Sequence, residues 1–78
     1  MSFKKLDSVV LTKDMPKHGL KKEDVGAVVH VYPDGQMEVE FVTAGGKTQD
    51  VATLESSDVR PITPLDMIAV RRLVQTAA

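Results

Sequence analysis

The side chains best suited to bind another molecule gather in one polar stretch of the sequence, residues 13–24. Lysine ammonium groups and a histidine imidazole can bind phosphates or the carboxylates of a partner. The stretch also contains Pro16 and Gly19, which argue against a helix, so we expect a long loop that carries these groups into solvent. This basic loop is the first candidate for partner binding. Its candidate contact residues are Lys13, Lys17, His18, Lys21 and Lys22.

Two kinds of partner suit such a loop. A nucleic acid would meet the lysines with its phosphates, but the loop contains no aromatic residue that could stack on a base. The net charge of the chain is -1, which lacks the basic excess of a dedicated nucleic-acid binder. A protein partner is therefore favoured over nucleic acid, and a solvated loop without any partner is the simplest interpretation.

Metal binding and catalysis have weaker support in the sequence. Glu38 and Glu40 fall on one face of a predicted strand, with His30 opposite Glu38, but a metal site needs three or four converging ligands. An exposed histidine–glutamate pair explains this arrangement more simply. The chain has no cysteine, and its serines have no histidine and acid at a spacing that suggests a triad. We therefore expect no metal, no cofactor and no enzymatic activity.

Short apolar runs separated by turn residues predict five β-strands in the first 62 residues. One of these runs, residues 36–42, alternates polar and apolar side chains, which is typical of a strand with one buried face. Pro61 restricts the last strand to the edge of a sheet. The predicted strands are residues 8–12, 25–32, 36–42, 48–54 and 59–62, with a 3₁₀ turn over residues 55–58.

The turn Pro33-Asp34-Gly35 predicts the register of the second and third strands. Proline suits the start of a type I turn, and Gly35 is expected to take a positive φ in the left-handed position. A three-residue loop then aligns one wholly apolar face and one mixed face. The expected pairs are Val31 with Met37, Val29 with Val39 and Ala27 with Phe41 on the first, and Tyr32 with Gln36, His30 with Glu38 and Val28 with Glu40 on the second.

A glycine pair separates the third and fourth strands. We expect a two-residue turn at Gly45-Gly46, which is a favourable dipeptide for a tight hairpin. This turn would place Ala52 opposite Val39 and Leu54 opposite Met37. Since all four side chains are apolar, the same register would bury them on one face of the sheet.

The sharpest local signal lies at residues 63–66. Thr63 is a favourable N-cap, Pro64 stands where a helix tolerates proline, and Asp66 can return the capping hydrogen bond. These residues predict a helix from about residue 64 to residue 75 with one apolar half. We expect that half to pack on the strands, or else on a second copy or another partner. Its candidate contact residues are Met67, Val70, Leu73 and Val74.

Together these elements predict an all-β fold: a small five-stranded SH3-like barrel over residues 1–62, with a C-terminal amphipathic α-helix over residues 63–78. A chain of 78 residues forms one domain at most. No apolar run reaches the length of a membrane span, and the N-terminus lacks the apolar segment of a secretory signal. We therefore expect a cytoplasmic protein without a membrane partner.

Four segments of the sequence resemble a family of small bacterial proteins that is labelled only as a domain of unknown function. They are Val9 to Leu11, Leu20 to Val29, Val39 to Val42 and Val59 to Pro61, within roughly residues 6–62. The same outline is more distantly similar to the photosystem I reaction-centre subunit IV and to the variable chain of ferredoxin–thioredoxin reductase. Both are SH3-like, non-catalytic subunits. The resemblance implies an SH3-like fold and brings no reaction and no binding residues.

These observations favour a non-enzymatic protein-interaction module whose partner the sequence does not identify, with a homodimer through the C-terminal helix as one form. The alternative is a nucleic-acid-binding barrel that acts through the loop from Lys13 to Lys22. A third hypothesis is a small protein that neutralises a neighbouring toxin.

Overall fold

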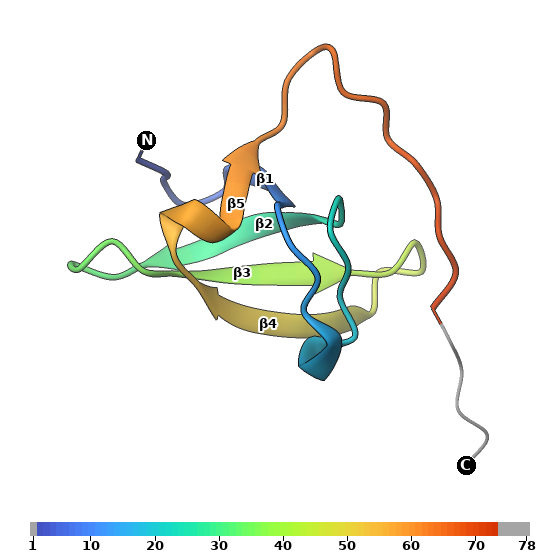
Figure 1. The fold of residues 1–78 in the computed structure, drawn as a ribbon. Coiled ribbons are helices and arrows are strands. Elements are labelled where there is room, and N and C mark those ends of the chain that lie inside the picture. Colours follow the sequence, from blue (N-terminus) through green and yellow to red (C-terminus); the bar gives the residue numbers. More distant parts are fainter. Residues whose placement is uncertain (1, 74–78) are drawn as a thin grey trace.

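The computed structural model describes residues 2–73, in which tight turns join five β-strands (Figure 1). All five strands lie within two residues of their predicted bounds. The expected turn after the fourth strand is present as a 3₁₀ turn, η2, and another, η1, interrupts the long basic loop. The elements are β1 (Ser8–Leu11), η1 (Pro16–His18), β2 (Val25–Val31), β3 (Met37–Val42), β4 (Thr48–Leu54), η2 (Ser56–Asp58) and β5 (Val59–Pro61).

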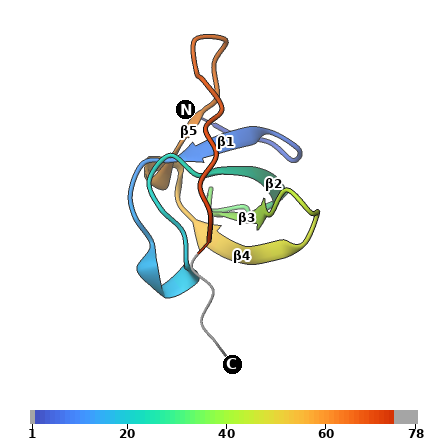
Figure 2. The ribbon, with the colours of Figure 1, turned by 90° about the vertical axis from the view of Figure 1, so that its right-hand side faces the viewer.

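The strands form one antiparallel sheet in the order β4-β3-β2-β1-β5. The all-β, five-stranded prediction is therefore confirmed, but the sheet does not close into the expected small SH3-like barrel. The sheet curls strongly (Figure 2), yet β4 and β5 both remain edges of the sheet in the described part of the chain. Strand β5 has only three residues and contains Pro61, which has no N–H to donate to a further strand.

One face of this sheet makes the core. Alternate residues of each strand point to the same side, and the side chains on that side are apolar. The basic loop contributes Leu20, which reaches the core from outside the strands. The buried cluster consists of Val9, Leu11, Leu20, Val28, Met37, Val39, Phe41, Ala52, Leu54 and Val59.

The β2–β3 hairpin confirms part of the predicted register and corrects the rest. Gly35 has φ of 92°, and the pairs of Val31 with Met37 and of His30 with Glu38 are as expected. Beyond them a β-bulge at Val29 shifts the pairing by one residue. The expected pairs Val29–Val39, Ala27–Phe41 and Val28–Glu40 are therefore wrong, and Val28 pairs with Val39 while Ala27 pairs with Glu40.

The shift at Val29 has a simple cause. Val28 and Val39 are both fully buried, so the core requires the two side chains on one face. Successive residues of a strand point to opposite faces, so the register set by the turn alone would place Val28 and Val39 on different faces. The extra residue of the bulge brings both side chains to the core face.

The β3–β4 hairpin reaches the predicted register by a different route. Ala52 pairs with Val39 and Leu54 with Met37, as expected. The turn itself has three residues rather than two, because the Thr43 N–H donates to the Lys47 carbonyl at 2.8 Å. A second irregularity in β4, between the partners of Phe41 and Val42, adds the residue that brings the two apolar faces back into alignment.

The predicted C-terminal helix is wrong. The capping residues form one turn, in which the Thr63 N–H donates to Asp66 Oδ2 at 2.7 Å, but no α-helix follows through Leu73. A helix of about twelve residues is marginal without tertiary packing. Met67 and Val70 are 93% and 96% exposed, so nothing in the described chain covers the apolar half. The helix-face candidate Val74, with the rest of residues 74–78, lies outside the described residues.

Gly26 should be the glycine of the sheet least tolerant of a side chain. A Cβ at this position would lie 2.7 Å from Val39 Cγ1 and 3.0 Å from the Glu40 carbonyl oxygen, so β2 would have to move away from β3. We expect Gly26→Ala to lower the free energy of unfolding by about 1–3 kcal/mol in urea denaturation. Gly45→Ala is the control, since a Cβ there comes no closer than 3.8 Å to another atom. Equal stability of the two variants would contradict this close packing.

Candidate functional site

The segment that replaces the predicted helix is an extended strap, residues 62–73. It leaves the end of β5, rises away from the sheet and returns past the ends of the strands (Figure 1). Extended backbone covers about 3.3 Å per residue, against 1.5 Å in a helix. The strap therefore reaches further from β5 than a helix of the same residues would.

The first point of attachment joins the strap to β5. Arg60 Nη1 and Nη2 donate to the two carboxylate oxygens of Asp66, each at 2.9 Å, which is a bidentate pair. The Arg60 guanidinium, together with the Thr63 N–H, holds the pKa of the Asp66 carboxyl well below its ordinary value. The carboxylate that was expected to cap a helix is thus also engaged by an arginine from the sheet.

The second point of attachment joins the strap to the basic loop. Arg71 Nε donates to Asp24 Oδ1 at 2.8 Å, and Arg71 Nη2 donates to Asp24 Oδ2 at 2.6 Å and to the Gly19 carbonyl at 3.1 Å. Burial alone raises the pKa of Asp24, but hydrogen bonds from Arg71 and from the Lys21 N–H outweigh it and lower the pKa below 3.8. Asp24 is therefore ionised at neutral pH and holds the strap through Arg71.

Beside Asp66 and between Asp66 and Arg71, the strap exposes large apolar side chains. Leu65, Met67 and Val70 are each more than 90% exposed, and Ile68 is 68% exposed. Leu73, the remaining described candidate of the predicted helix face, is half-buried. Adjacent apolar side chains that are exposed together are uncommon on a monomer and mark interaction sites.

The basic loop is less positive than its sequence suggests. Lys13 Nζ forms an ion pair with Asp58 at 2.8 Å, and the hydrogen bond between them raises the pKa of Lys13. His18 Nδ1 forms a hydrogen bond with Asp50 of β4. The candidates that remain exposed, without an ion-pair partner in residues 2–73, are Lys17, Lys21 and Lys22.

The structure brings the two sets of sequence candidates together. Arg71, in the strap, contacts Asp24 and Gly19 of the loop that carries the lysines. Neither Arg71 nor Asp24 was among the predicted site residues. They are 47 positions apart, and no local pattern connects residues at such a distance.

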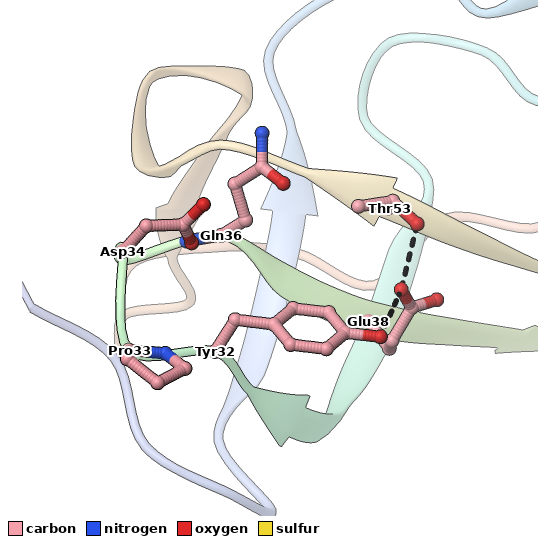
Figure 3. Close-up of a pocket in the computed structure, with 6 residues that line it drawn as sticks. All are labelled: Tyr32, Pro33, Asp34, Gln36, Glu38 and Thr53. Carbon is pink, nitrogen blue, oxygen red and sulfur yellow. Dashed lines mark hydrogen bonds between the residues drawn. The ribbon is translucent and has the colours of Figure 1, made fainter.

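A second feature, a shallow pocket, lies at the β2–β3 hairpin (Figure 3). The Tyr32 hydroxyl and the Thr53 hydroxyl both donate to Glu38 Oε1, at 3.0 and 2.6 Å. The hydrogen bond to Glu38 favours the neutral phenol and raises the pKa of Tyr32. His30 packs edge-on against the Tyr32 ring, with 4.6 Å between the ring centroids. Within residues 2–73, no three histidine or acidic side chains are grouped as metal ligands would be.

Comparison with known proteins places most of this chain in one family. Residues 5–61 match the protein-family model described as "Domain of unknown function (DUF4926)", which confirms the resemblance to a family of that label. The matched range covers all five strands and the basic loop. No curated protein and no solved structure matches the chain. Through Leu73, the structure contains no helix with the length and apolar character that would cross a membrane.

The attachment of the strap should depend on the charge of Asp24. Its pKa is lowered in the folded protein, so the stabilisation is complete above pH of about 4 and is lost as the pH falls through the lowered value. We expect Asp24→Asn to increase the population of molecules with a detached strap severalfold at neutral pH, because a partly exposed ion pair contributes about 1 kcal/mol. The Arg71 Nε–H resonance in NMR spectra reports the release, and acidification of the wild type should reproduce it.

Asp34→Asn is the control for this measurement, since Asp34 lies in the β2–β3 turn and pairs with neither Arg60 nor Arg71. An Arg71 resonance that is unchanged in Asp24→Asn would show that this ion pair does not hold the strap.

Proposed function

The chain belongs to the DUF4926 family, and from this premise we propose that it is a non-enzymatic protein-interaction module that binds its partner through the strap. We take the cytoplasm as its compartment, as the sequence led us to expect. The proposal concerns residues 62–73, and the five-stranded sheet serves as the rigid body from which the strap projects.

One observation carries this proposal: the exposure of Leu65, Met67 and Val70 on a strap that two arginine–carboxylate pairs hold. Contact with water is unfavourable for exposed apolar side chains, and about 25 cal/mol of binding free energy is gained for each Å² of apolar surface that a partner covers. An extended segment that is already held at both ends also loses less conformational entropy on binding than a free tail would. The strap therefore presents an apolar surface in an ordered form.

A double substitution in the strap tests the proposal. We expect Met67→Asp combined with Val70→Asp to weaken partner binding at least tenfold, since charged side chains cannot enter an apolar contact without losing hydration. The wild type and the variant would be used to capture proteins from an extract of the producing cells. A protein retained by the wild type would then be purified and titrated against both by calorimetry.

The same substitutions should leave the stability of the domain within about 0.5 kcal/mol, because both native side chains are more than 90% exposed. Leu6→Asp is the matched control: Leu6 is an exposed apolar residue outside the strap, and aspartate tolerates its positive φ. If the strap variant binds a purified partner as tightly as the wild type does, the strap is not the contact surface.

Nucleic acid binding through the basic loop is the second candidate, and the exposure of Lys17, Lys21 and Lys22 is the observation in its favour. Phosphate contacts weaken steeply with salt. We expect no retention of single-stranded or duplex oligonucleotides at physiological salt, measured by fluorescence anisotropy. A sub-micromolar affinity that falls with salt and is lost when these three lysines become glutamate would place nucleic acid first.

A further inference from the structure

The sheet face opposite the core carries an exposed apolar group of its own. Glu40 pairs with Ala27 of β2 and with Val51 of β4, so these three residues share the outer face. By the two-residue period of a strand, Val25 and Val42 lie on the same face, one step further along β2 and β3. The exposed fractions of Val25, Val42 and Val51 are 41%, 55% and 44%. We call this group the outer valine patch.

The β3 residues beside the outer valine patch are acidic, and Arg60, which shares this face through Val10, is already paired with Asp66. Glu38 and Glu40 share its face, and Asp34 follows in the turn at the end of β2. Thr48 Oγ1 donates to Glu40 Oε2 at 2.6 Å, which holds this carboxylate on the surface of the sheet beside the patch. Among the residues of β2, β3 and β4 there is no lysine or arginine to offset the two glutamates.

The strap has the complementary character. Its apolar side chains are followed by Arg71 and Arg72, and Arg72 has no ion-pair partner within residues 2–73. Arg71 attaches the strap next to Lys21 and Lys22 of the basic loop. An apolar segment with a basic end therefore faces solvent on the same molecule as an apolar patch with acidic neighbours.

The sizes of the two surfaces also agree. The exposed part of the strap, residues 65–70, spans about 17–20 Å if extended, and three neighbouring strands span about 10 Å between the outer two. The segment is therefore long enough to cross β2, β3 and β4. Within its own molecule the strap is held at Asp66 and at Arg71, and its apolar side chains remain exposed rather than covering the outer face.

We propose that the partner of the strap is a second copy of this chain, and that the strap of each copy lies across the outer valine patch of the other in a two-fold symmetric dimer. This inference rests on the proposed function and names its partner. A two-fold axis makes the contact twice, once for each strap, which brings a short segment closer to the 1,200 Å² or so that a stable interface buries. It also closes the assembly at two copies, since each strap and each patch is used once.

Disulfide trapping tests the contact directly, because the native chain has no cysteine. We expect a mixture of the single variants Met67→Cys and Val42→Cys to form a mixed disulfide within minutes under mild oxidation. Each variant alone should form less of its own dimer. Leu6→Cys mixed with Val42→Cys is the control, since Leu6 is also largely exposed, at 78% against 93% for Met67, but lies outside the strap. Equal yields from the two mixtures would overturn the proposed contact.

Sedimentation equilibrium then tests the dimer without any disulfide. We expect the wild type to be dimeric at about 100 µM, and both Met67→Asp and Val42→Lys to sediment as folded monomers. Val51→Lys serves as a second variant of the patch if Val42→Lys proves unstable. A dimer that survives both the strap and the patch variants, or that is lost only with the strap variant, would overturn the inference.

A wild type that stays monomeric at this concentration would also overturn the inference, and would leave the proposed function standing. The strap would then bind a protein other than a second copy, which the calorimetric titration of the strap variant measures independently. Failure of the dimer and failure of the strap as a contact surface therefore give different results.

Discussion

Burial of a single face of the sheet is the constraint on which the rest of the structure depends. Ten apolar side chains meet on that face, and no polar or charged residue is buried among those described. Because a strand turns each successive residue to the opposite side, one extra or missing residue would move a whole row of core side chains into water. The β-bulge at Val29 and the irregularity in β4 both preserve this parity.

A core on one side leaves the other side of the sheet open to solvent. Within residues 2–73 no helix or second sheet lies on that side, and the large apolar side chains of the strap stay exposed. Val10 of β1 is buried on this side as well, whereas Val25, Val42 and Val51 stay partly exposed, and the hydroxyl groups of Thr48 and Thr53 are bonded to the two glutamates of β3. An exposed face of this kind is available for contact with another molecule.

The ion pairs of the protein have a positioning role rather than a large share in stability. The side chains of Arg60 and Arg71 are 40% and 32% exposed, and such pairs contribute little because water already solvates the separated charges. Their geometry is nevertheless specific, since a bidentate arginine fixes both the distance and the orientation of a carboxylate. Two such pairs suffice to hold the strap extended between β5 and the basic loop.

Local patterns in the sequence determined the strands, the turn at Gly35 and the single buried face, because turn residues and two-residue periodicity act over a few neighbouring positions. Only the tertiary structure decided the fate of residues 63–73. The hydrogen bond that Asp66 was predicted to return to the Thr63 N–H is local and forms, but a helix also needs a surface to cover its apolar half. The bonds of Arg60 to Asp66 and of Arg71 to Asp24 hold the segment extended instead. The second joins residues 47 positions apart, and such a contact depends on how the strands fold together, which no short stretch of sequence encodes.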